Sequence, residues 1–328
     1  MAEVRVGTTI FRRDLSPVLT VFRLIPEPGD RFPPYKAGQY IALRRENCRL
    51  TKRTVLPGGA ATYLPDLDAN GVQRRGPVTH SYSISSAPFE TELHGYLEFY
   101  VILELDGSGI PGRLTESLFQ LDPASDGRLS YFAKIAGEFT AEKVTADFEN
   151  VVMVGTGTGL APFASMMKQV DHEASTGRRS PKRFTLFHAN RGFNELGYHE
   201  ELLRIEREGQ IDFTYVPSVS RPSVEIYQNA AIGKGRANNL LRAVLGMPSK
   251  EEEDLAAAQA SGAGVAEAEE RLHRAVHALL PSHLSAETIR KRMPVNSSIV
   301  ITCGNPRAMA DIGAIADANG LKFEKEEW

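Results

Sequence analysis

Cysteine is scarce in this chain of 328 residues, which contains only Cys48 and Cys303. Two thiolates cannot by themselves ligate an iron–sulfur cluster, and we predict no metal site in the chain. The two residues could form one disulfide, but a cytoplasmic setting, which the N-terminal sequence favours, argues against it. We therefore expect no disulfide.

Long apolar runs and a strong excess of one charge are also missing. No apolar segment is long enough to span a bilayer, and Glu3, Arg5 and Arg12 fall where a signal peptide would need an apolar core. The formal net charge is −3, and no run rich in Lys and Arg points to nucleic acid. We therefore predict a cytoplasmic protein with no membrane span and no nucleic-acid partner.

The first half of the chain has the pattern of short strands divided by turns. Its mostly apolar, β-branched or aromatic segments are residues 19–22, 40–43, 81–85 and 96–103. Turns rich in Gly, Pro and Asp lie between them, at residues 26–30, 57–59 and 106–109. This spacing favours a small antiparallel β-barrel, with its best short helix at residues 114–121. The polar stretch 51–79 is expected to be a long loop or an irregular hairpin.

Strands and helices alternate in the second half. The expected strands are residues 151–154, 184–187, 213–216 and 298–302, and the expected helices are residues 163–170, 198–208 and 238–245. Such alternation indicates βαβ units and a doubly wound parallel sheet. We therefore predict a two-domain β plus α/β protein, with a barrel domain at residues 1–148 and an α/β domain at residues 149–328.

A helical insertion is expected at about residues 248–292 of the second domain. Residues 250–278 are rich in Ala and Glu, with the sequence Ser-Gly-Ala-Gly at residues 261–264. This composition predicts two helices joined by a Gly-containing turn. A solvated helical decoration is favoured over a partner-docking or oligomerisation element.

A glycine-rich loop, Gly155-Thr156-Gly157-Thr158-Gly159, follows the first strand of the α/β domain, and Pro162 opens the next helix. Glycines let the backbone turn tightly and approach a pyrophosphate, and a helix N-terminus offers free N–H groups. The spacing is not the GxGxxG fingerprint, and a plain tight turn is the alternative. The strand–loop–helix context favours a dinucleotide site.

Coenzyme preference is usually marked where the second and third strands end. No acidic residue of the kind that binds the ribose diol of NAD stands at the end of the second strand. Instead Arg191 follows that strand, Ser220 and Arg221 follow the third strand, and Arg236 comes shortly after. Three arginines near the carboxyl ends of strands could converge on one phosphate, so the set favours NADP(H).

A series of motifs closely resembles the ferredoxin–NADP reductase family, in the family's order, over residues 37–328. His80-Ser81-Tyr82-Ser83-Ile84-Ser85-Ser86 resembles the flavin motif RxYSxxS. The chain's end, Glu326-Glu327-Trp328, resembles the family's terminal acid and aromatic. The remaining matches are Ala37-Gly38-Gln39-Tyr40, residues 97–101, Gly112-Arg113-Leu114-Thr115, residues 155–162 and Cys303-Gly304-Asn305-Pro306-Arg307-Ala308-Met309.

The resemblance implies a β-barrel that binds FAD and an α/β domain that binds NADP(H). Tyr82 would pack on one flavin face, Ser83 would lie beside flavin N5, and Ser85 and Ser86 complete that motif. The second motif, from Gly112 to Thr115, would hold the FAD pyrophosphate. Gly304 and Met309 belong to the motif that begins with Cys303.

Three residues near the C-terminus carry roles in this resemblance. Cys303 would shape the nicotinamide pocket, with a buried core cysteine as the alternative. Glu326 would serve proton or electron transfer, with a solvated tail carboxylate as the alternative. Trp328 would cover the other flavin face and move when the nicotinamide stacks.

The sequence departs from the family's pattern at two positions. His80 stands where the motif has an arginine that pairs with the FAD pyrophosphate, and Arg113, Arg74 or Arg75 could supply that charge. Trp328 stands where many members have Tyr.

The expected activity is that of a ferredoxin–NADP(+) reductase. Hydride would pass between NADP(H) and FAD, and single electrons would pass to or from a separate ferredoxin or flavodoxin. The alternatives are an NAD(P)H-dependent reductase component of an oxygenase system and a non-catalytic flavin-binding module.

Overall fold

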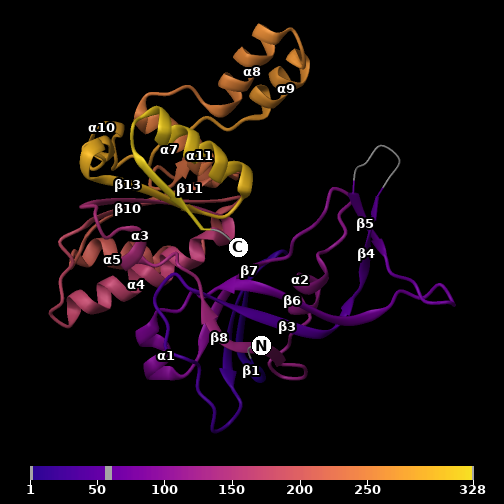
Figure 1. The fold of residues 1–328 in the computed structure, drawn as a ribbon. Coiled ribbons are helices and arrows are strands. Elements are labelled where there is room, and N and C mark those ends of the chain that lie inside the picture. The colour runs from indigo at the N-terminus through magenta and orange to yellow at the C-terminus, as the bar shows by residue number, and fades with distance from the viewer. Residues whose placement is uncertain (1–2, 56–60, 327–328) are drawn as a thin grey trace. The chain divides into compact units, whose positions relative to one another are not determined.

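The computed structural model describes residues 3–55 and 61–326, which form two compact units (Figure 1). Of the described residues, one unit contains 3–35, 39–55, 61–84 and 90–136, and the other contains 36–38, 85–89 and 137–326. The second unit thus includes two short segments of the N-terminal half. The limit at residue 148 stays a prediction.

The first unit is built on a six-stranded antiparallel sheet that forms a half-barrel, in the order β6-β3-β8-β1-β2-β7. Its strands are β1 (Val4–Ser16), β2 (Leu19–Pro26), β3 (Tyr40–Arg49), β6 (Arg75–Ser83), β7 (Leu97–Ile102) and β8 (Arg128–Ala136). The predicted antiparallel architecture is confirmed, although β1 and β8 were not expected. Helix α1 (Pro88–His94) follows the flavin motif, and α2 (Arg113–Phe119) confirms the predicted short helix.

Apolar side chains from the strands and α2 fill the half-barrel. Phe22 of β2 and Phe99 of β7 are both buried, and their ring centroids lie 5.3 Å apart. Leu114 and Leu118 of α2 belong to the same cluster. Apolar side chains of β2, β3, β6, β7 and β8 together with those of α2 give this unit its own core.

The stretch predicted as a loop or hairpin contains the antiparallel strands β4 (Thr51–Val55) and β5 (Ala61–Pro65). The irregular hairpin is therefore the correct alternative. Strand β6 begins at Arg75, inside the stretch expected to be irregular, because it pairs with β3 along its length. The predicted strand at residues 81–85 ends at Ser83. The predicted turn at residues 57–59 lies outside the described residues.

The second unit contains a six-stranded parallel sheet in the order β12-β11-β10-β9-β13-β14. Its strands are β9 (Asn150–Thr156), β10 (Arg183–Asn190), β11 (Asp212–Val219), β12 (Gly233–Lys234), β13 (Ser298–Cys303) and β14 (Lys322–Lys325). The order reverses between β9 and β13, which is the topological switch point where open α/β sheets bind ligands. The predicted doubly wound sheet is confirmed.

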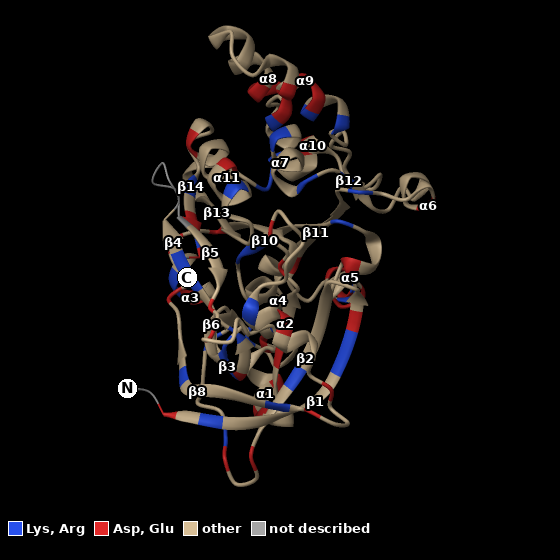
Figure 2. Ribbon diagram, turned by 90° about the vertical axis from the view of Figure 1, so that its right-hand side faces the viewer, with Lys and Arg blue, Asp and Glu red and all other residues tan. Residues whose placement is uncertain are grey.

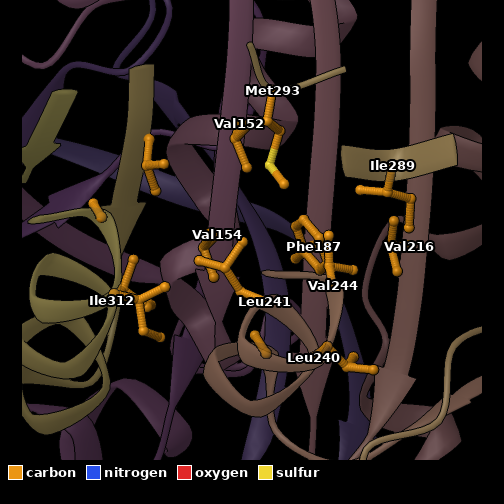
Figure 3. Close-up of a cluster of buried hydrophobic side chains, with 14 of the residues drawn as sticks. Val152, Val154, Phe187, Val216, Leu240, Leu241, Val244, Ile289, Met293 and Ile312 are labelled. Atoms are coloured by element: carbon orange, nitrogen blue, oxygen red, sulfur yellow. The ribbon is translucent and has the colours of Figure 1, made fainter. Parts of the chain in front are cut away.

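Helices cover both faces of this sheet (Figure 1). Helices α4 (Ala161–Ser175) and α5 (His199–Glu208) lie on one face, and α7 (Ala237–Leu245) and α11 (Pro306–Ala318) on the other. Smaller elements are α3 (Ala141–Val144), α6 (Val224–Gln228), α10 (Ala286–Arg290) and the 3-10 turns η1 (Gly157–Leu160), η2 (Phe193–Glu195) and η3 (Val295–Ser297). Figure 3 shows the apolar contact between the sheet and the α7 face, where Val152, Val154 and Phe187 meet Leu241 and Val244.

The predicted insertion forms two helices, α8 (Lys250–Ser261) and α9 (Val265–Arg274). Gly262 and Gly264 between them have positive φ angles of 71° each, which a glycine adopts without strain. Ser249 begins α8 with a capping box, because its side chain accepts from Glu252 N and Glu252 bonds back to Ser249 N. The helix pair stands on the α7 side of the sheet (Figure 1).

Candidate functional site

The glycine-rich loop joins β9 to α4 at the switch point of the parallel sheet. Gly157 has a φ of +58°, and a Cβ added there would meet no atom within 4 Å. A Cβ on Gly159, in contrast, would lie 2.1 Å from the Cys303 carbonyl oxygen. Pro162 occupies the first turn of α4, where its missing N–H is not needed. The loop is thus open at Gly157 and packed at Gly159, as a backbone cradle for a phosphate requires.

The loop after β13 is interlocked with the glycine loop. Gly304 has a φ of +126°, and a Cβ there would lie 2.3 Å from Thr156 Oγ1. Asn305 N donates to the same Thr156 oxygen over 2.9 Å, and the Asn305 side chain caps α11 by accepting from Arg307 N and Ala308 N. Met309 is buried in the first turns of α11. The glycine loop and the loop after Cys303 therefore lie together where β9 and β13 end.

A buried thiol–carboxylate pair lies at this edge. Cys303 Sγ donates to Glu326 Oε2 over 2.7 Å, and Glu326 N donates to Thr302 O over 3.0 Å. Cys303 is fully buried and Glu326 is 3% exposed. Burial, and then the neighbouring Glu326 carboxylate, raise the pKa of Cys303 well above its usual range. Glu326 is therefore not a solvated tail residue, and the Cys303 thiol stays protonated near neutral pH.

Both thiols are expected to resist modification in the folded protein. The pKa of Cys48 is also raised, chiefly by burial, and the thiolate is the reactive form. With an aromatic disulfide reagent at pH 8, we expect both thiols to react in denaturant and neither to react quickly without it. A Cys48→Ala variant isolates Cys303. Rapid reaction of native Cys48→Ala protein would contradict the buried, protonated thiol.

The predicted phosphate-binding residues follow three adjacent strands of the parallel sheet. Arg191 follows β10, Ser220 and Arg221 follow β11, and Arg236 follows β12. Arg221 N donates to Arg191 O over 2.8 Å, and Ser220 Oγ donates to Asn190 O over 3.2 Å. Parallel strands end at a common edge, so the structure brings these residues to the edge that carries the glycine loop.

The three arginines differ in their counter-charges. Arg191 lies 3.6 Å from the Glu195 carboxylate, and Arg236 lies 2.8 Å from the Glu251 carboxylate. Within residues 3–55 and 61–326, no carboxylate lies within ion-pair distance of the exposed Arg221. Arg221 is therefore the arginine most available to a new anion.

A hollow lined by residues that follow Arg221 in the chain was not predicted from the sequence. Its lining residues are Pro222, Ser223, Val224, Tyr227 and Gln228. Ser223 begins α6 by accepting from Ile226 N, a local capping signal that was readable in the sequence. The hollow offers apolar surface on the segment that follows the arginine.

His188 of β10, near the same edge, belongs to the core. It is fully buried, and its Nδ1 lies 2.9 Å from the Tyr215 hydroxyl. Burial, and to a smaller degree His199, lower the pKa of His188 to about 3. The ring is therefore neutral at physiological pH and offers no charge to a phosphate.

The flavin motif begins on β6 of the first unit. Tyr82 is half-buried against the core cluster, and burial raises its pKa. Ser83 ends the strand and is 7% exposed. His80 is exposed and pairs with Leu43 of β3 in register. The strand thus presents His80 to solvent, packs Tyr82 against the core cluster and buries Ser83 at its end.

The second flavin motif forms the start of α2. Gly112 precedes the helix, and the buried Thr115 hydroxyl donates to Gly112 O over 3.1 Å. Leu114 is buried in the core, and α2 packs on β3 and β6. Arg113 is thus a cation on a helix that contacts the His80 strand. Arg75, in contrast, donates to Asn47 O at the far end of β6.

Ser85 and Ser86 belong to the second unit, together with residues 87–89. Tyr198 Oη donates to Ser85 Oγ over 2.8 Å, and Ser165 Oγ of α4 donates to Ser86 O over 2.7 Å. Tyr198 has a φ of +61°, which is uncommon for a residue other than glycine. The residues of the flavin motif are therefore divided between the two units. The sequence patterns did not predict that Tyr198 contacts this motif. Trp328 lies outside the described residues.

Comparisons with known proteins agree with this fold. Residues 153–254 match the family of oxidoreductase NAD-binding domains. No match was found among curated protein sequences. Within the described part of the chain, no helix combines the length and apolar character needed to cross a membrane.

Solved structures resemble the chain over its whole length. A ferredoxin NADP+ reductase from Neisseria gonorrhoeae, with bound FAD and NADP, is 17% identical with a TM-score of 0.59, covering 99% of each chain. The FAD/NAD-binding domain of a nitric oxide dioxygenase from Vibrio cholerae is 16% identical with a TM-score of 0.59, covering 98% of each. A cytochrome P450 reductase from Amycolatopsis is 16% identical with a TM-score of 0.56, covering 100% of this chain and 71% of that one. These likenesses establish a shared two-domain fold.

Proposed function

We propose that this chain is a flavin-dependent NADP(H) oxidoreductase. It has the two-domain fold of ferredoxin–NADP reductase-like proteins, and part of it matches the family of oxidoreductase NAD-binding domains. Bound FAD and NADP(H) would supply the redox chemistry, with hydride passing between them and electrons passing singly to or from a carrier protein. The protein's own residues would bind, orient and shield the two groups.

The edge where β9 and β13 end is the observation that carries this proposal. There the open Gly157, the packed Gly159 and the buried Cys303–Glu326 pair occur together. Backbone N–H groups at the start of α4 would hold the coenzyme's pyrophosphate. Because its thiol is protonated, Cys303 would shape the nicotinamide pocket without acting as a nucleophile. Glu326 would hold the thiol in place and could relay a proton.

The first unit supplies residues suited to FAD. Tyr82 offers an aromatic face, and Ser83 a buried hydroxyl that would stabilise charge developing on the ring. Gly112 and Thr115 would hold the pyrophosphate through the start of α2. Arg113 is the preferred replacement for the motif's missing arginine, because its helix packs on the strand that carries His80.

We propose NADP(H) as the coenzyme, on the basis of Arg191, Ser220, Arg221 and Arg236 at one sheet edge. Replacing Arg221 with alanine is expected to raise the KM for NADPH about tenfold and to leave the KM for NADH nearly unchanged, because only NADPH carries the 2′-phosphate. Steady-state oxidation of each coenzyme with ferricyanide as acceptor measures both values.

Arg207→Ala is the matched control for that experiment. Arg207 is exposed near the C-terminus of α5, at the opposite edge of the sheet, and its loss should change neither KM. Equal effects of Arg221→Ala on both coenzymes would remove the support for NADPH. They would favour an NADH-dependent enzyme.

The proposed electron partner is a separate ferredoxin or flavodoxin. The reductase component of an oxygenase system is the second candidate, and structural relatives include a ferredoxin reductase described in carbazole 1,9a-dioxygenase, 14% identical with a TM-score of 0.53. A purified ferredoxin and a purified flavodoxin, each tested for NADPH-dependent reduction, separate these candidates from a non-catalytic flavin module. The module would oxidise no NADPH even with ferricyanide.

A further inference from the structure

The insertion contacts the proposed phosphate site through one ion pair. Arg236 Nη1 lies 2.8 Å from Glu251 Oε1, in the first turn of α8. The Arg236 side chain is 68% exposed, whereas that of Glu251 is only 8% exposed. The guanidinium therefore faces solvent while its counter-charge is buried behind it.

Glu251 is held in place by a second contact and by the anchoring of α8. Its Oε2 accepts from Asn239 Nδ2 of α7 over 2.7 Å, and Asn239 Oδ1 accepts from Lys250 N over 2.9 Å. Nearby, the buried Arg242 of α7 donates to Glu253 and to Asp311 of α11. These bonds fix the first turn of α8 against α7, so Glu251 cannot leave Arg236 without losing buried hydrogen bonds.

Acidic and basic side chains lie close together at this junction. Figure 2 shows acidic and basic segments together where α8 meets α7. Glu251, Glu252 and Glu253 all lie in the first turn of α8. Only Glu251 among them pairs with Arg236, so it reduces the positive potential that Arg236 offers to an anion.

We propose that Glu251 makes the insertion a determinant of coenzyme specificity. Its carboxylate neutralises Arg236 and thereby weakens the binding of 2′-phosphorylated nucleotides. The chain thus discriminates less strongly between NADPH and NADH than its three arginines would otherwise allow. This inference rests on the proposed function, since it concerns the same nucleotide edge.

The test is Glu251→Gln, which keeps a carbonyl oxygen that can accept from Asn239 or Arg236 but removes the negative charge. The flavin-loaded variant should bind 2′,5′-ADP roughly three- to tenfold more tightly than the wild-type protein, with no change for 5′-AMP, which lacks the 2′-phosphate. The ratio of kcat/KM for NADPH to that for NADH should rise by the same factor. Titration calorimetry and initial rates measure these quantities.

Asp254→Asn is the matched control, because Asp254 lies on the same helix and pairs with Lys250, not with Arg236. It should leave the 2′,5′-ADP affinity and the coenzyme ratio unchanged. Arg236→Ala in the Glu251→Gln background should abolish the gain. An unchanged or lower affinity of Glu251→Gln for 2′,5′-ADP would overturn the inference.

Measurements on the wild-type protein distinguish a failure of this inference from a failure of the proposed function. If it reduces its flavin with NADPH and Glu251→Gln has no effect, only the role of Glu251 fails. If the wild-type protein binds neither NADPH nor NADH, the proposed function fails, and the role of Glu251 fails with it.

Discussion

Replacing Ser83 with alanine is expected to slow hydride transfer from NADPH to bound FAD about 10²- to 10³-fold. Ser83 ends β6 and is almost fully buried. A hydrogen-bond donor aimed at developing charge has its largest effect in such a water-excluded place. Alanine removes the hydroxyl without adding volume, so the flavin should remain bound. Anaerobic stopped-flow absorbance at the flavin band measures the rate, and the absorbance ratio of flavin to protein measures the content.

Ser81→Ala is the control for this experiment. Ser81 lies on the same strand but is exposed, so removing its hydroxyl leaves no buried group without a hydrogen-bond partner. Its rate should stay within about twofold of the wild-type rate, as is usual for a surface substitution. Equal rates for Ser83→Ala and Ser81→Ala would show that the Ser83 hydroxyl takes no part in hydride transfer.

Gly159→Ala is expected to destabilise the second unit by about 3 kcal/mol and to abolish measurable coenzyme binding. The added Cβ would lie 2.1 Å from the Cys303 carbonyl oxygen and 2.5 Å from the Gly304 Cα. Both obstacles are backbone atoms, so the glycine loop and the loop after β13 must separate to admit the methyl group. Denaturant unfolding followed by circular dichroism, together with coenzyme titration, measures the two effects.

Gly157→Ala separates the clash from the general cost of losing a glycine. Gly157 has a positive φ, but its Cβ would meet nothing within 4 Å, so we expect a loss of only about 1 kcal/mol. A similar small loss for Gly159→Ala would mean that the two loops are not interlocked.

The sequence predicted the architecture well where pattern and local chemistry agree. Short apolar runs located β9, β10, β11 and β13, and the Gly-containing turn between α8 and α9 was readable from composition. Strand β8 was missed because it pairs with β1 and β3, which are both distant in sequence, and β1 was missed although it forms a hairpin with β2. Strand β1 alternates between exposed and buried residues only along part of its length.

Part of the site depends on contacts that no local pattern encodes. The burial of Glu326 depends on Cys303, 23 positions earlier, and a carboxylate near a chain end otherwise reads as solvated. The pairing of Arg236 with Glu251 depends on how α8 docks on α7. The hydrogen bond from Tyr198 to Ser85 joins residues 113 positions apart. Motifs located the loops of the candidate site, whereas tertiary packing set the charges around them.

The proposed function requires this chain to transfer hydride between NADPH and a bound flavin. The most direct measurement is the visible spectrum of the FAD-loaded protein under anaerobic conditions, followed after NADPH or NADH is added to separate samples. We predict flavin bands that bleach rapidly with NADPH and more slowly with NADH. Absence of a flavin band after incubation with FAD, or bands that neither coenzyme bleaches, would contradict the proposed function.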